Sequence, residues 1–136
     1  MQRRRDERGA AVVEFALILP ILVMFVFGIV EFGRAYSARI ELTAAVREGA
    51  RAAAVADPSA PAAATLAATK NATIDSAPGL KPSLTQDQVL VTPCPATPGA
   101  SASAEVTTTY PFRYEIPFVG TRSWSLTATG VFRCGG

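Results

Sequence analysis

The sequence predicts an α+β protein, in which a long N-terminal helix is followed by a small antiparallel β-sheet of about three strands. Two patterns indicate this class. Residues 10–57 have helical spacing, first apolar on every side and then amphipathic, and end at a proline. Residues 87–136 instead contain short segments rich in β-branched residues, separated by Pro and Gly. An Ala-, Pro- and Thr-rich connector, residues 58–86, joins the two parts.

The first half of the helix, about residues 10–30, is expected to span a membrane. Its length fits the roughly 20 residues that cross a bilayer. Four arginines precede the apolar run, which favours a cytoplasmic N-terminus and an extracytoplasmic C-terminal part, although Arg34 and Arg39 flank the other end. No small-residue signal cleavage motif ends the run, so we expect the segment to remain as a single-pass anchor.

One acidic residue, Glu14, lies inside the apolar run. A charge near the middle of a membrane helix costs about 2.5 kcal/mol or more, so Glu14 needs a partner or a function. The alternative is an interfacial role, because Glu14 lies close to the N-terminal end, where a carboxylate reaches headgroups and interacts with the helix dipole.

Pro20 interrupts the same run. A proline removes one intrahelical hydrogen bond, so we expect a kink or a loosened turn at this position. The alternative is the ordinary tolerance of membrane helices for proline.

The second half of the helix is amphipathic. Two sets of apolar residues recur every four positions, Phe32, Tyr36 and Ile40 in one and Leu42 and Val46 in the other. Small residues, mostly alanine, predict a surface that neighbouring helices can approach closely: Ala44, Ala45, Gly49, Ala50, Ala52, Ala53 and Ala54. Asp57-Pro58 is expected to end the helix.

The remaining elements are short. We expect a helix from residue 60 or 61 to residue 74 within the connector, and strands at residues 88–91, 105–110 and 122–132. Pro111 is expected to close the second strand, which leaves residues 112–121 as a loop.

Two cysteines, Cys94 and Cys134, lie in the part expected to be extracytoplasmic, where disulfides persist. A disulfide would close a loop of about forty residues and contribute ~3–4 kcal/mol on the loop-entropy model. Two free, partly buried thiols are the alternative.

The sequence favours no enzymatic activity, cofactor or metal. It contains no histidine, and its acidic residues are scattered. The net charge is only +2, and part of it comes from the basic N-terminus. No basic patch with interleaved aromatics follows, so nucleic acid is not an expected partner.

The N-terminal sequence resembles the processing region of type IV-like prepilins, and most closely the TadE-like minor pilins or pseudopilins of the tight-adherence (Flp) pilus system. The resemblance is carried by the basic residues 1–9 ending at Gly9, by Glu14-Phe15, by Leu19-Pro20 and by Glu31-Phe32-Gly33. It implies that residues 1–9 are a leader peptide and that a prepilin peptidase cuts between Gly9 and Ala10. Glu14 and Phe15 would then be the fifth and sixth residues of the mature chain.

The resemblance also implies a function. The protein would be a bacterial pilin inserted in the cytoplasmic membrane, processed, and assembled with other Flp/Tad pilins on an assembly platform for pilus biogenesis and adhesion, with a final location in the membrane or in an extracellular pilus. Glu14 would meet the new α-amine of Ala10 on a neighbouring subunit. The alternative is an uncleaved, membrane-anchored surface binding module, with Phe112, Tyr114 and Phe118 as contact candidates.

Overall fold

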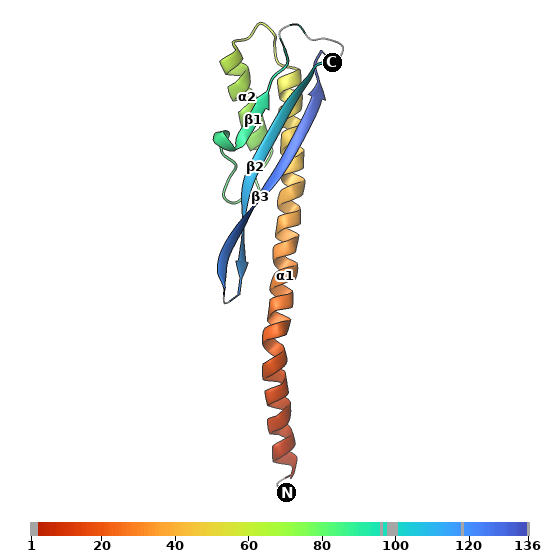
Figure 1. The fold of residues 1–136 in the computed structure, drawn as a ribbon, viewed down its shortest axis with the longest axis vertical. Coiled ribbons are helices and arrows are strands. Elements are labelled where there is room, and N and C mark those ends of the chain that lie inside the picture. The colour runs from red at the N-terminus through yellow and green to blue at the C-terminus, as the bar shows by residue number, and fades with distance from the viewer. Residues whose placement is uncertain (1–2, 96, 98–100, 118, 136) are drawn as a thin grey trace. The chain divides into compact units, whose positions relative to one another are not determined.

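The computed structural model describes residues 3–95, 97, 101–117 and 119–135. The long helix α1 spans Arg3–Ala54, and α2 spans Ala62–Asp75 (Figure 1). A short 3-10 turn, Gln86–Gln88, leads into three strands: β1 (Val89–Thr92), β2 (Ser103–Ile116) and β3 (Gly120–Arg133). The predicted α+β layout, a long helix followed by a three-stranded antiparallel sheet, is confirmed.

The chain forms two compact units, and α1 contributes to both. The first unit is Met1–Arg34 with Arg113–Arg122, and the second is Ala35–Phe112 with Ser123–Gly136. The second unit contains the hydrophobic core.

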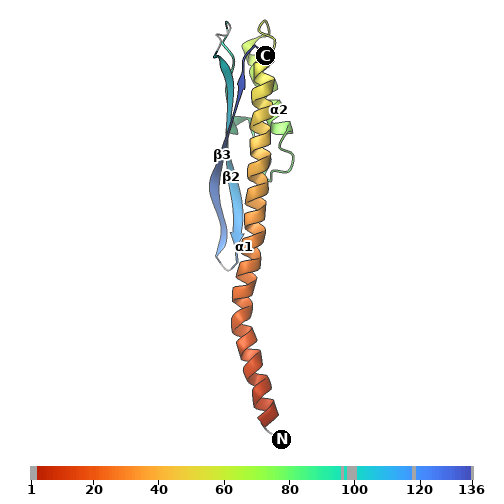
Figure 2. The same cartoon turned by 90° about the vertical axis from the view of Figure 1, so that its right-hand side faces the viewer.

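The core of the second unit lies between α1, α2 and the sheet. Figures 1 and 2 both show the strands running beside the C-terminal part of α1. The helix buries one face, and β2 buries alternate residues, as a strand with one covered face should. The buried apolar residues of these two elements are Ala38, Leu42, Ala45, Val46, Ala50 and Ala53 on α1, and Ala104, Val106, Tyr110 and Phe112 on β2.

The small residues of α1 pack against other elements of the same chain. A Cβ at Gly49 would overlap the Thr73 hydroxyl of α2 and lie 3.5 Å from Val106 Cγ1 of β2. Ala45, Ala50 and Ala53 are buried beside it. The small-residue surface that the sequence predicts for contact with neighbouring helices is therefore largely covered by α2 and the sheet.

The approach of β3 to α1 is closer still. A Cβ at Gly130 would overlap the backbone carbonyl of Val46 and lie 2.9 Å from the Arg47 amide nitrogen. Only a residue without a side chain fits there, because the neighbouring atoms are backbone and cannot rotate away.

The sheet has the order β1-β2-β3. β1 pairs antiparallel with β2 from Val89 opposite Thr108 to Thr92 opposite Glu105. Between β2 and β3, the hydroxyls of Thr107 and Thr129 lie 3.0 Å apart and share a hydrogen bond.

The predicted loop at residues 112–121 is wrong. β2 does not close at Pro111 but continues to Ile116, and β3 already begins at Gly120, so residues 112–121 are mostly strand. The pairing with β1 ends at Thr108, so β2 has a neighbour on only one side at Pro111. A proline is tolerated on such an open edge, where its missing N–H removes no ladder hydrogen bond.

Polar contacts hold the segments that connect the main elements. The Gly79 amide donates to Glu41 Oε1 at 2.5 Å, and the Tyr110 hydroxyl donates to the Pro82 carbonyl at 2.9 Å. After α1, Asp57 Oδ1 accepts hydrogen bonds from the hydroxyl and the amide of Ser59, and these bonds hold the pKa of Asp57 below its usual value. This turn directs the chain towards α2, the short helix that the connector sequence predicts.

Candidate processing and assembly segment

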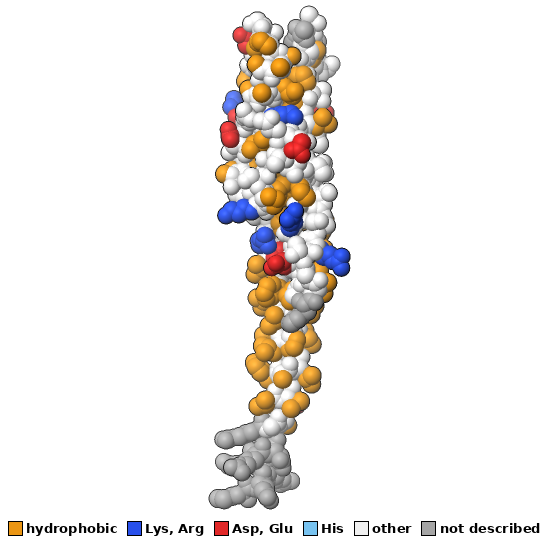
Figure 3. Space-filling model, turned by 90° about the vertical axis from the view of Figure 1, so that its left-hand side faces the viewer, with side chains coloured by type: hydrophobic (Ala, Val, Ile, Leu, Met, Phe, Trp, Pro, Cys, Tyr) orange, Lys and Arg blue, Asp and Glu red, His pale blue; other side chains and the backbone are white. Residues whose placement is uncertain are grey.

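The N-terminal half of α1 is an exposed apolar helix. Its most apolar 18-residue window has a mean hydropathy of 2.7, and none of that window is buried by the described part of the chain. On the face drawn in Figure 3, hydrophobic side chains gather along the N-terminal half of the molecule's long helix. By length and composition this helix can cross a membrane, whose lipid would cover side chains such as Phe15, which is 62% exposed.

The residues of the predicted cleavage site lie on α1 itself. Gly9 and Ala10 are both exposed. Apart from its chain neighbours and the nearby helix backbone, no described atom lies within 4 Å of the position that a Cβ would take at Gly9. The helix begins at Arg3 rather than at Ala10, so the Gly9–Ala10 bond lies inside a continuous helix. The sequence did not predict this, because the resemblance to prepilins implies that residues 1–9 are a leader and so places the start of the helix at Ala10.

Glu14 and Phe15 are also exposed on the same helix. Ala10 and Glu14 are four residues apart, so they lie on one face. Among the described residues Glu14 has neither a hydrogen bond nor an ion pair. Because Glu14 is exposed, a partner outside this chain can reach its carboxylate.

Pro20 does not interrupt α1, which continues through it as one helix. No described atom crowds Gly28 further along the helix. A kink or a loosened turn at Pro20 remains a prediction.

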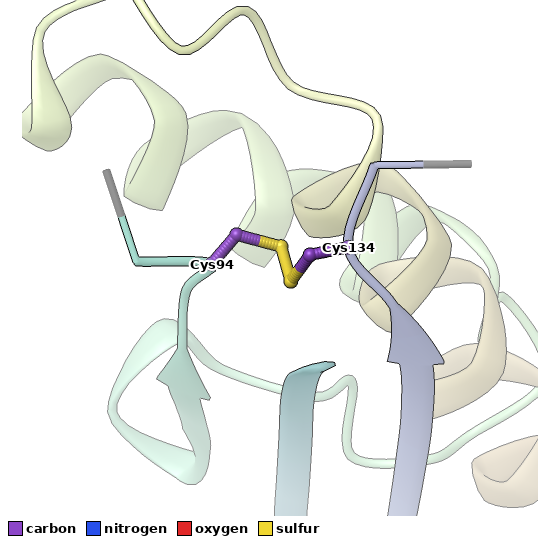
Figure 4. The surroundings of a disulfide bond; sticks show 2 residues. All are labelled: Cys94 and Cys134. Atoms are coloured by element: carbon purple, nitrogen blue, oxygen red, sulfur yellow. A yellow bond between two sulfur atoms is a disulfide. The ribbon is translucent and has the colours of Figure 1, made fainter. Parts of the chain in front are cut away.

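Cys94 and Cys134 form a disulfide (Figure 4). Their Cα atoms lie 5.9 Å apart, within the range of ordinary bridges. The Cys134 amide also donates to the Ala102 carbonyl at 2.9 Å. The bridge joins the segment after β1 to the end of β3, and the two free thiols of the alternative interpretation are not what the structure contains.

Changing Cys134 to serine is expected to destabilise the β-sheet unit by about 3 kcal/mol, because the unfolded chain regains the freedom of a forty-residue loop. Urea unfolding of the full chain in detergent would measure this. Cys94→Ser should have the same effect, and the double variant should add little to either. Full alkylation of both thiols in the native, non-reduced protein would contradict the bridge.

The aromatic residues considered for a surface binding module are arranged differently from the prediction. Phe112 is only 6% exposed and packs at 6.5 Å, centroid to centroid, from Trp124 of β3. Tyr114 is half-buried, and Phe118 lies outside the described residues. The structure therefore gives Phe112 a core role, and the exposed aromatics of β3 that the sequence interpretation did not consider include Trp124 and Phe132.

Among the described side chains of α1, Glu31 pairs with Arg34 at 2.7 Å and Glu48 pairs with Arg51 at 2.6 Å. The hydrogen bond from Arg51 lowers the pKa of Glu48. Both pairs are of the i, i+3 kind that stabilises a helix weakly. In the described ranges no cluster of His, Cys, Asp and Glu is suited to hold a metal ion.

Comparison with known proteins identifies the segment just described. Residues 9–51 match the family model described as TadE-like protein. No curated protein and no solved structure matches the chain. The match covers Gly9, Ala10, Glu14, Phe15 and Pro20 and ends within α1. Residues 9–51 are therefore similar to TadE-like proteins, the family that the N-terminal sequence resembles.

Proposed function

We propose that this protein is a minor pilin or pseudopilin of a tight-adherence pilus. The observation that carries the proposal is the TadE-like match over residues 9–51, on an exposed apolar helix that bears Glu14. The first half of α1 inserts in the cytoplasmic membrane, a prepilin peptidase removes residues 1–9, and the mature chain joins other pilins on the assembly platform for pilus biogenesis and adhesion. The protein is then a substrate of processing and not an enzyme.

The proposed topology places the N-terminus in the cytoplasm. Residues 10–30 form the span within the helix of residues 10–57, and residues 58–86 and 87–136 form an extracytoplasmic connector and β domain. The Cys94–Cys134 bridge supports this direction, because disulfides persist outside the cytoplasm.

Cleavage requires a local opening of α1. The Gly9–Ala10 bond is helical in the full-length chain, whereas a protease needs access to the backbone. A glycine inside a helix costs about 1 kcal/mol relative to alanine, so Gly9 makes opening easier at this bond. It also places no side chain in the path of the peptidase.

Assembly depends on Glu14 in this proposal. Cleavage creates a positive α-amine at Ala10, and Glu14 supplies a negative charge on the same helix face. An ion pair between neighbouring subunits in a low-dielectric bundle is strong when the geometry is good, and an unpaired member is heavily penalised. Neighbouring helices then pack in the one register that pairs Glu14 with the Ala10 amine, because any other register leaves both charges unpaired.

Glu14→Ala is therefore expected to mature normally and to remain in the membrane, because removing a charge eases insertion. It should fail to co-purify with partner pilins, since the Ala10 amine lacks its acceptor. Glu14→Gln should behave like Glu14→Ala, and Glu14→Asp should retain part of the wild-type yield. Wild-type co-purification of Glu14→Ala would refute the assembly role.

A further inference from the structure

The C-terminal half of α1 has a surface that the described residues of the chain leave uncovered. A groove of about 320 Å³ lies on this surface, within the unit Ala35–Phe112 and Ser123–Gly136. We refer to it as the arginine groove, and its lining residues are Tyr36, Arg39, Ile40, Thr43, Ala44 and Arg47.

The floor of the arginine groove is apolar and has helical spacing. Tyr36 and Ile40 are 61% and 55% exposed, although both are large side chains with apolar surface. Ala44 follows at the next four-residue step and is also exposed. Ridges of residues spaced by four are the surfaces that pack against another helix, and a small residue such as Ala44 lets that helix approach closely.

Two positive charges border this floor without a neutralising group. Among the described residues, neither Arg39 nor Arg47 forms an ion pair. The acids of the same half of α1 are engaged elsewhere, because Glu41 accepts the Gly79 amide and Glu48 pairs with Arg51. The groove therefore complements an apolar surface that is flanked by carboxylates.

Neither lipid nor a second copy supplies that surface. Arg47 follows Val30 by seventeen residues, which at 1.5 Å per residue is about 25 Å along the helix from the end of the apolar run, too far for a headgroup. Two copies joined groove to groove would place arginine against arginine. The other helix of a second copy, α2, bears only Lys70 and Asp75 as charged residues, so it cannot supply two carboxylates to the groove.

We propose that the arginine groove binds an acidic amphipathic helix of a different pilin subunit. Two carboxylates about eight residues apart on that helix face Arg39 and Arg47, and its small apolar residues pack on Tyr36, Ile40 and Ala44. This inference rests on the proposed pilin function and adds to it the chemistry of the partner and the surface that receives it.

The test places a photo-reactive benzophenone amino acid at position 40 of the full chain in its native membranes. Mass spectrometry of the cross-linked product should identify a helix of another pilin with two acidic residues eight positions apart. Arg39→Glu combined with Arg47→Glu should lower the cross-link yield roughly tenfold or more, because like charges then face each other. Changing both partner carboxylates to lysine should restore the yield.

Arg113→Glu combined with Arg122→Glu is the matched control, since both side chains are exposed and the change in charge is identical. It should leave the yield unchanged, and an intact Cys94–Cys134 bridge should confirm folding of every variant. A product with lipid or with a second copy, the absence of a product, or a yield insensitive to the charge reversal would overturn the groove assignment. An N-terminus at Ala10 in the same samples would show that the pilin function survives such a failure.

Discussion

Gly130→Val is expected to separate β3 from α1 and to unfold much of the sheet. The added side chain would meet the Val46 carbonyl and the Arg47 amide, which are backbone groups of a packed helix. Relief requires the strand to move away, and the contacts of β3 with the core are lost with it. Overpacking of this kind costs about 3 kcal/mol or more, a large share of the 5–15 kcal/mol that stabilises a typical domain.

Urea unfolding of the full chain in detergent, together with protease resistance, would measure this loss. Thr127→Val is the matched control, because Thr127 is exposed on the same strand and the change adds no contact to α1. Gly49→Ala offers a second comparison, since its obstacle is the Thr73 side chain and Thr73→Ala should partly rescue it. A wild-type unfolding midpoint for Gly130→Val would refute the close packing of β3 on α1.

Gly9→Val is expected to abolish maturation. A branched side chain next to the scissile bond obstructs the peptidase, and it removes the local helix weakness that glycine provides. The full-length chain should accumulate in the membrane, where immunoblotting separates it from the mature form. Gly28→Val is the matched control, because Gly28 lies in the same helix and its surroundings are equally open. Normal maturation of Gly9→Val would contradict cleavage at this bond.

The elements of the fold were largely predictable because their signals are local. Apolar periodicity and Asp57-Pro58 predicted α1 to within a few residues at its C-terminal end, and β-branched runs predicted three strands. The start of α1 was missed, because the residues before Gly9 were interpreted as a separate leader and continue the helix instead.

Long-range packing was not predictable from the same signals. Leu42 and Tyr36 both belong to four-residue repeats, yet the first is buried and the second exposed. Which of the two is buried depends on which face of α1 the sheet and α2 cover. The close packing at Gly49 and Gly130 shows which face that is, and it is visible only in the structure. The length of β2 could not be predicted for the same reason. β1 begins at Val89, opposite Thr108, and so leaves the edge at Pro111 open, which is a property of strand pairing.

The candidate site shows the same division. Gly9, Ala10, Glu14 and Phe15 were identified from one short stretch of sequence, and the TadE-like match covers that stretch. Cys94 and Cys134 were paired by their expected location outside the cytoplasm, and the structure joins them. The arginine groove was not foreseen, because it depends on three-dimensional features. These are the exposure of Tyr36 and Ile40 and the lack of an ion pair at Arg39 and Arg47 among the described residues.

The central claim is that this chain is a processed pilin subunit. Mass spectrometry of the intact protein, purified from its native membranes without a tag at the N-terminus, tests it most directly. The account predicts a chain that begins at Ala10 and lacks residues 1–9. A chain that keeps the leader, with Gly9 still joined to Ala10, would contradict it and would favour the uncleaved membrane-anchored module.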